Sequence, residues 1–267
     1  MQSKSKDDAV VFSYDGDSRA ELKIKEWEVG MFQDELAGSQ SIRIRRRPPT
    51  GPPLHYVGPF EFRLQNKGNT RNILEEILWN KDEEISQLKD GKPIYKLKKE
   101  LEYASPVKDF IGALKASYAC TGLPALISEV KKSSPSREVL RKDFDLVQVV
   151  QAYEEGGAAC LSVLTDTKYF QGSFENMEAI NRAGVKCPLL CKEFIIDAWQ
   201  IYYARTKGAD AVLLIAAVLP DLDIEYMIEI CKSLGMATLV EVCKIINSVA
   251  VYSLVSSEYS NLRYLFW

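Results

Sequence analysis

The strongest constraint on the fold is a regular alternation of short apolar runs and amphipathic segments after Gly122. Short apolar runs separated by helical segments are typical of buried parallel strands. Each amphipathic segment is followed by a glycine, as expected where a helix ends. The pattern therefore predicts four βα units and a fifth strand. The expected strands are Pro124–Val130, Cys160–Thr165, Pro188–Phe194, Ala211–Ala217 and Ala237–Val242, and the expected helices span 145–155, 173–183, 198–207 and 221–234.

Two architectures can hold such units, namely an open doubly wound sheet and part of a (β/α)₈ barrel. A G-x-G-x-x-G turn would favour a dinucleotide-binding open sheet, and the sequence contains none. On the pattern alone, both architectures remain open. Ahead of the first strand we expect further helices from Asn72 to near Gly91, over Tyr95–Tyr103 and after Pro106.

The charge balance argues against several classes of protein. Lys and Arg total 34 and Asp and Glu total 37, which gives a net charge of −3. A protein that binds nucleic acid through bulk positive charge is therefore disfavoured. The longest apolar stretches, such as Ala211–Leu219, are shorter than the ~20 residues that a membrane-spanning helix needs, so we expect no membrane association.

The cysteines and the single histidine limit the available chemistry. None of the six cysteines is spaced C-x-x-C, and we interpret them as buried free thiols in a reducing compartment. His55 lies between proline-rich runs, which disfavours a histidine-based zinc site or a Ser-His-Asp triad. Chemistry in this chain is therefore expected to rest on carboxylates and lysines, without a metal.

The N-terminal seventy or so residues differ in character from the rest. Ser41–Pro53 joins a basic run to four prolines, which excludes a regular helix. This stretch can be an RNA-binding or docking arm or a solvated linker, and we favour the linker. Acidic residues such as Asp7 and Asp15 argue against an intact organelle transit peptide.

Charged side chains close three of the expected strands, although burying an unpaired ion costs several kcal/mol. They are Glu129, Lys131, Lys192, Glu193 and Glu241. All of them fall at the carboxyl ends of parallel strands, where α/β folds gather their active sites. This position marks them as candidates for function.

Strand alternation assigns these side chains to faces. Two lysines beside two carboxylates in a partly dry pocket would suit proton transfer on an anionic substrate. The alternative is a set of structural salt bridges, or lysines that reach solvent at the sheet rim. Lys132 and Glu193 are expected to face the helical layer with solvent contact. One consistent assignment turns inward the set Glu129, Lys131, Lys192 and Glu241.

Two loops next to these strand ends carry hydroxyls and aromatic side chains. Ser133–Ser136 follows the first strand and Thr165–Glu175 follows the second. These loops could line a pocket for an aromatic, phosphorylated ligand, or they could be ordinary turns.

An ordered series of motifs resembles the indole-3-glycerol-phosphate synthase family. The motifs are E-V-K-K-S-S-P-S, S-V-L-T-D-T-K-Y-F-Q-G-S-F-E, L-L-C-K-E-F-I-I-D, G-A-D-A-V-L-L-I-A and L-V-E-V, and they fall within the stretch from about Asn72 to Val242. The segment Val57–Asn66 is similar to the extension of the plant plastid forms. The resemblance implies a (β/α)₈ barrel with extra N-terminal helices, and a decarboxylating lyase of tryptophan biosynthesis that needs no cofactor.

The resemblance also implies roles for individual residues. Lys192 matches the general acid that protonates the ribulose carbonyl of 1-(2-carboxyphenylamino)-1-deoxyribulose 5-phosphate during ring closure. Lys131, paired with Glu129, would contact the substrate carboxylate and assist dehydration. Glu241 would stabilise the cationic intermediate or act as a base. The positions that match the lining of the substrate pocket are Ser134, Pro135, Phe170, Phe194 and Leu213.

After Val242 the chain departs from the family pattern. The expected sixth to eighth strands, with their Asn-x-Arg and Glu-Ser-Gly motifs and phosphate-binding glycines, do not follow. We therefore expect an incomplete barrel of about five strands with open edges at its first and fifth strands. The expected organisation is an extension or linker over 1–71, the partial barrel over 72–242 and an atypical tail over 243–267.

The function expected from the resemblance is indole-3-glycerol-phosphate synthase, with little or no activity in this chain. The first alternative is a non-catalytic fragment that associates with a full-length synthase. The second is another ribulose-phosphate-binding barrel such as phosphoribosylanthranilate isomerase. The expected ligand is a small phosphorylated substrate, and the expected location, by resemblance, is the chloroplast, otherwise the cytoplasm.

Overall fold

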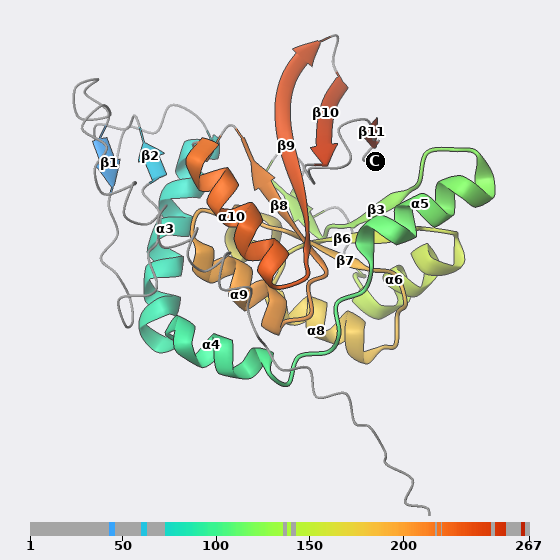
Figure 1. Ribbon diagram of the computed structural model, residues 1–267, viewed down its shortest axis with the longest axis horizontal. Helices are drawn as coiled ribbons and strands as arrows, with labels where there is room; N and C mark the ends of the chain where they lie inside the picture. The colour runs from blue at the N-terminus through green and yellow to red at the C-terminus, as the bar shows by residue number, and fades with distance from the viewer. Residues whose placement is uncertain are drawn as a thin grey trace, which may run out of the picture.

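The computed structural model describes residues 43–45, 60–62, 73–135, 138–139, 143–216, 218–219, 221–246, 249–254 and 263–264. Their central feature is a seven-stranded sheet in the order β11-β10-β9-β8-β7-β6-β3. Two small two-stranded sheets accompany it, β4 with β5 and β1 with β2, and the second of these is labelled in Figure 1. None of the described helices is long and apolar enough to cross a membrane.

Five parallel strands form the core of the large sheet, and each lies on one of the apolar runs predicted to be a strand. Neighbouring strands follow one another in chain order, and their pairing is parallel. A doubly wound sheet would reverse its strand order at a switch point, whereas a barrel adds strands in sequence. The structure is therefore an incomplete (β/α)₈ barrel. The strands are β3 (Ile127–Val130), β6 (Cys160–Leu164), β7 (Leu189–Lys192), β8 (Ala211–Ile215) and β9 (Ala237–Ile246).

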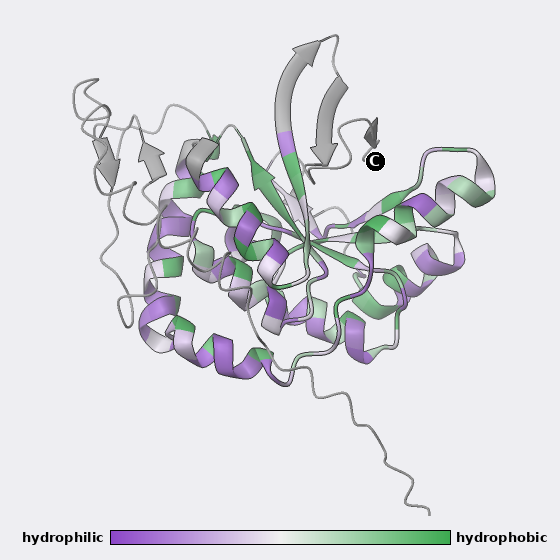
Figure 2. Cartoon of the chain, viewed as in Figure 1, coloured by the Kyte–Doolittle hydropathy of each residue, from purple (hydrophilic) through white to green (hydrophobic). Residues whose placement is uncertain are grey.

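The crossover helices cover the outer face of these strands. They are α6 (Leu146–Glu155), α8 (Phe174–Arg182), α9 (Ala198–Thr206) and α10 (Asp221–Ser233). The outward strand residues Leu161, Val163 and Leu214 share one buried cluster with Val150, Met177 and Ile230 of the helices. Figure 2 shows the result as largely hydrophobic strands and helices that carry both polar and apolar colours.

A second core fills the inner face of the sheet. Helix α5 (Phe110–Thr121) inserts Phe110 and Leu114 among the inward side chains Ile127, Leu190 and Leu213. Asp109 caps this helix by accepting a hydrogen bond from the Gly112 amide at 2.7 Å. Helix α5 therefore occupies the amino-terminal half of the inner face and leaves the carboxyl ends of the strands accessible.

The first two described helices, α3 (Ile73–Gly91) and α4 (Ile94–Leu101), pack against the outer layer. The ammonium of Lys89 lies 2.6 Å from the Asp197 carboxylate, which caps α9. The indole of Trp199 donates to the Lys92 carbonyl at 2.7 Å. These contacts, one buried and one partly buried, fix the end of α3 and the turn that follows it to α9.

One expected open edge is closed by the tail of the chain. Strand β10 (Val249–Leu254) pairs antiparallel with β9, and β11 (Arg263–Tyr264) pairs with β10. The prediction of an open edge at the fifth strand was therefore wrong, because backbone groups of the tail satisfy that edge. In the described part of the chain, β3 pairs on one side only.

Short elements complete the described structure. Strand β1 (Arg43–Arg45), which lies in the basic, proline-containing stretch, pairs antiparallel with β2 (Phe60–Phe62). After β3, β4 (Ser133–Ser134) pairs with β5 (Glu138–Val139). The one-turn helix α7 (Thr167–Phe170) follows β6.

The cysteine prediction holds for four of the five thiols that the structure describes. Cys160, Cys187, Cys191 and Cys231 are buried and free, whereas Cys120 is exposed. The prediction was wrong for Cys120 because the last turn of α5 extends beyond the core that its first turn fills. The side chain of Cys243 and the whole of His55 lie outside the described residues.

Candidate active site

A cavity of about 240 Å³ opens at the carboxyl ends of the parallel strands. It brings together the four charged side chains that strand alternation turned inward. Its lining consists of Glu129, Lys131, Lys192 and Glu241 with Leu74, Leu164, Phe170, Glu193, Phe194, Leu213 and Ile215.

Strand register explains this convergence. Lys192 is in register with Leu164 of β6, and Glu241 is in register with Ile215 of β8. Residues in register on parallel strands point to the same face of the sheet. Each of these pairs therefore projects into the cavity.

Glu129 is the centre of the charge cluster. Its carboxylate lies 2.5 Å from the Lys192 ammonium and also pairs with the Lys131 ammonium. Burial alone would raise the pKa of Glu129, but the two lysines outweigh burial and lower it. Glu129 is therefore ionised at neutral pH and holds the two ammonium groups next to the same space.

The surroundings of Glu241 shift its pKa in the direction opposite to the shift of Glu129. Burial raises the pKa of its carboxyl, attraction to Lys192 opposes the rise, and repulsion from Glu129 adds to it. A carboxyl with a raised pKa, next to an ionised carboxylate and an ammonium, holds its proton to a higher pH than an ordinary carboxyl and is suited to proton transfer. The two acids of the site thus have different protonation behaviour.

An aromatic pair forms one wall of the cavity. The ring centroids of Phe170 and Phe194 are 6.0 Å apart, and the rings are tilted by 37°. Phe170 ends helix α7, after which Gln171 takes a left-handed conformation with φ 51°. Gly172 follows, where a Cβ would lie 2.1 Å from the Leu164 carbonyl oxygen, so only glycine allows the loop to approach β6 this closely.

The structure brings three of the five predicted pocket residues to the cavity. Phe170, Phe194 and Leu213 line it. Ser134 lies in β4 and is half-buried, and Pro135 is exposed. Neither of these two is among the residues that line the described cavity, so their role in substrate binding stays a prediction.

Glu193 differs from its prediction. Its side chain faces the helical layer as expected, but it is fully buried rather than in contact with solvent. Lys81 of α3 lies 3.1 Å from it, and the Thr165 hydroxyl donates to it at 2.8 Å. The prediction of solvent contact was wrong because α3 covers this part of the strand and supplies a cation. Lys132 is half-buried.

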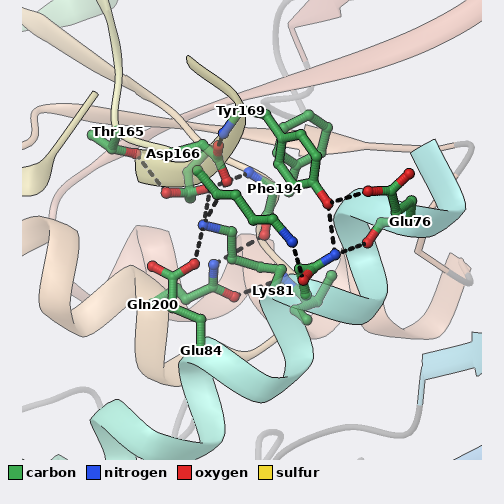
Figure 3. A network of polar contacts seen from close by, with 12 residues as sticks. Glu76, Lys81, Glu84, Thr165, Asp166, Tyr169, Phe194 and Gln200 are labelled. Carbon is green, nitrogen blue, oxygen red and sulfur yellow. Dashed lines mark hydrogen bonds and ion pairs between the residues drawn. The ribbon is translucent and has the colours of Figure 1, made fainter. Parts of the chain in front are cut away.

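Lys81 is the centre of a second buried charge network, which joins α3 to residues that follow β6 and β7 (Figure 3). Its ammonium contacts Glu84 at 2.8 Å, Asp166 at 2.9 Å and Glu193 at 3.1 Å. Burial would lower the pKa of Lys81, but the three carboxylates outweigh burial and raise it, so the lysine is charged.

Lys81 was not among the residues predicted to be functional, although its place in the sequence carries a signal. Ile77, Lys81 and Ile85 are spaced four residues apart, so the lysine lies on the apolar stripe of its helix. Ile77 and Ile85 are both buried. A cation in the middle of such a stripe needs a buried anionic partner, but the stripe itself does not identify the partner.

No group of three or more metal-ligating side chains occurs among the residues that the structure describes. The fold and the site thus define a partial (β/α)₈ barrel whose candidate chemistry is carried by lysines and carboxylates. A family model described as indole-3-glycerol phosphate synthase matches residues 74–250. The match extends past Val242, where the tail was expected to leave the family pattern.

Curated relatives carry the same description. "Indole-3-glycerol phosphate synthase, chloroplastic" of Arabidopsis thaliana is 65% identical over 223 residues, which cover 83% of this chain and 56% of the relative. The indole-3-glycerol phosphate synthase of Rippkaea orientalis is 52% identical over 202 residues, which cover 75% of this chain and 67% of the relative. That of Microcystis aeruginosa is 54% identical over 202 residues, which cover 75% and 66%.

These matches show that the chain belongs to the indole-3-glycerol phosphate synthase family. The family is one of decarboxylating lyases of tryptophan biosynthesis, as the motifs indicated. The matched stretch is 56% of the Arabidopsis relative and 67% of the Rippkaea relative, so the chain spans roughly half to two thirds of their length.

Proposed function

We propose that the cavity binds 1-(2-carboxyphenylamino)-1-deoxyribulose 5-phosphate and carries the acid–base groups that close its indole ring. One observation carries this proposal. Two ammonium groups and two carboxylates with different protonation behaviour meet in a cavity that has an aromatic pair on one wall. A substrate with a carboxylated aromatic ring at one end and a carbonyl beside it matches those groups.

Lys192 is the proposed general acid for ring closure. The ring carbon that bears the carboxylate attacks the ribulose carbonyl carbon, and Lys192 donates a proton to the carbonyl oxygen. Loss of carbon dioxide from the same ring carbon then restores the aromatic system. The Lys192 ammonium is suited to this role because the ion pair with Glu129, 2.5 Å away, orients it toward the cavity.

Dehydration completes the proposed reaction. The hydroxyl formed in the first step leaves as water after it accepts a proton, and a ring proton is lost to form the indole double bond. Lys131, which pairs with Glu129, is the proposed acid. Glu241 is the proposed carboxylate that stabilises the cationic intermediate or accepts the proton. The balance is one substrate to one indole-3-glycerol phosphate, one carbon dioxide and one water.

We further propose that turnover by this 267-residue chain is much slower than turnover by a full-length relative. The cavity of about 240 Å³ lies below the roughly 300–1,000 Å³ that is usual for small-molecule sites. Binding of a remote phosphate normally helps to position reacting carbons, and the two cations among the described lining residues, Lys131 and Lys192, are already assigned to the reacting end of the substrate.

Fluorescence of the indole product tests both proposals on the purified chain. We expect slow product formation that is lost in Lys192→Met and retained in Lys232→Met, since Lys232 is an exposed lysine of α10 paired only locally with Glu229. Product formation that survives Lys192→Met would refute the assignment of the general acid. Turnover equal to that of a full-length relative would refute the expectation of slow catalysis.

A second proposal is that the chain associates with a full-length synthase. In the described part of the chain, β3 pairs with β6 alone, and Leu123 and Leu126 just before it are 66% and 42% exposed. A free strand edge beside exposed apolar side chains favours pairing with another chain. Co-purification with a tagged full-length synthase is expected, and separate elution of the two proteins would contradict the proposal.

We also propose a plastid location for the protein. The support is the name of the Arabidopsis relative, which is described as chloroplastic. A fluorescent fusion to the complete precursor is expected to accumulate in plastids, and a purely cytosolic signal would contradict this location.

A further inference from the structure

Lys81 of α3 joins two loops that carry the aromatic wall of the cavity. Its side chain is 1% exposed, and its ammonium lies close to the carboxylates of Glu84 and Asp166 (Figure 3). Two of its carboxylate partners, Asp166 and Glu193, are almost fully buried and follow different strands. One ammonium therefore links the ends of β6 and β7.

The first link leads to Phe170. Asp166 contacts Lys81 through Oδ2, while its Oδ1 accepts a hydrogen bond from the Tyr169 amide at 2.7 Å. Asp166 is the N-cap of α7, the one-turn helix that ends at Phe170. Because the helix is only four residues long, Phe170 lies within about one turn of this cap.

The second link leads to Phe194. Glu193 accepts a hydrogen bond from the Phe194 amide through Oε1 at 2.8 Å, and the same oxygen contacts Lys81. Its Oε2 accepts a hydrogen bond from the Thr165 hydroxyl at 2.8 Å. Lys81, Glu193 and Thr165 therefore fix the backbone that presents Phe194 and, one residue before Glu193, Lys192.

We propose that Lys81 is a positioning residue that sets the spacing of the Phe170–Phe194 ring pair and thereby the grip on an aromatic ring in the cavity. Lys81 does not line the cavity, so it acts through Asp166 and Glu193. The effect on ligand binding rests on the proposed function of the cavity, whereas the effect on ring spacing does not.

A purely structural role would make Lys81 only an anchor for α3. Lys89 provides the comparison, because it is the other buried lysine of the same helix and pairs with Asp197, the cap of α9. Asp197 does not line the cavity. If Lys81 were only an anchor, Lys81→Met and Lys89→Met would affect the cavity alike.

The experiment measures the two effects separately in the full chain. Nuclear Overhauser effects between the rings of Phe170 and Phe194 report their spacing without any ligand, in protein labelled at phenylalanine. Fluorescence titration with the reduced substrate, in which the ribulose ketone is an alcohol and cannot undergo ring closure, reports affinity without turnover. Circular dichroism at the titration temperature verifies that each variant is folded.

We expect Lys81→Met to lose the ring–ring Overhauser effects and to bind the reduced substrate about tenfold more weakly, which corresponds to about 1.4 kcal/mol. Lys89→Met is expected to keep both properties. Asp166→Asn keeps the oxygen that caps α7 but loses the charge that holds Lys81, so it should weaken binding in the same direction.

Several results would overturn the inference. Unchanged ring contacts in folded Lys81→Met, or equal losses in Lys81→Met and Lys89→Met, would show that Lys81 does not set the ring spacing. If Lys81→Met does not fold, Asp166→Asn takes its place in the test. Ring contacts and affinity in Asp166→Asn that equal those of the parent chain would then refute the inference. If the parent chain does not bind the reduced substrate, the proposed function fails, while the ring contacts still test the role of Lys81.

Discussion

Replacement of Lys81 by methionine should destabilise the protein in a pH-dependent manner. The substitution leaves the carboxyls of Asp166 and Glu193 buried at 1% and 2% exposure without their cation. Glu84 is 34% exposed at its side chain and can turn to solvent. Removal of one partner of a buried ion pair typically costs about 3–5 kcal/mol, which is the loss in unfolding free energy that we expect near neutral pH.

The sign of the pH dependence follows from Glu193. Burial raises the pKa of this carboxyl, Lys81 opposes the rise, and Asp166 adds to it. Without Lys81 the pKa rises further. A carboxyl whose pKa is higher in the folded than in the unfolded state makes its full contribution to stability only below the unfolded-state pKa of about 4.3. This contribution is lost as the pH rises through the folded-state pKa. The penalty of Lys81→Met should therefore be smaller in mild acid than above neutrality.

Urea denaturation at about pH 5 and about pH 8 measures this difference for the parent chain and the variant. The double variant Lys81→Met/Glu193→Gln should recover part of the loss at the higher pH, because it removes one of the two uncompensated charges. A penalty that is equal at the two pH values, or one below about 1 kcal/mol, would refute the argument that Lys81 compensates buried carboxylates.

Three further predictions concern single positions. The acid limb of the pH–rate profile should lie above the ordinary carboxyl range, because burial raises the pKa of Glu241 and its ionised form is the proposed base. In assays of product fluorescence, Glu241→Gln should abolish this limb. Gly172→Ala should lower the unfolding free energy by about 1–3 kcal/mol, measured in urea, because its Cβ would meet the Leu164 carbonyl oxygen at 2.1 Å. Asp145→Ala should cost about 1 kcal/mol in the same measurement, because Asp145 caps α6 through the Gln148 amide, and an unchanged midpoint would contradict that role.

The sequence predicted the parallel strands and crossover helices because their signals are local. An apolar run such as Ala211–Ile215 and a glycine such as Gly208, with φ 87° after α9, carry enough information within a few residues. The inward cluster was also predictable as one consistent assignment, since alternation within β3 and β7 separates Glu129 and Lys192 from the neighbours that point to the opposite face.

The misses depend on contacts between distant segments. Glu193 was expected to meet solvent because nothing near it in the sequence indicates that Lys81 covers it. Similarly, the pairing of β10 with β9 depends on backbone hydrogen bonds, which hydropathy in the tail does not encode. Ser134 was assigned to the pocket by resemblance; it lies in β4, which pairs with β5, and its role in the pocket stays a prediction.

The most direct test of the account is a crystal structure of the chain with the reduced substrate bound. We predict that the carboxylated ring lies against Phe170 and Phe194, with the Lys192 ammonium within hydrogen-bond distance of the hydroxyl that replaces the ketone. A ligand bound elsewhere, or one whose ring points away from these phenyl groups, would contradict the proposed site.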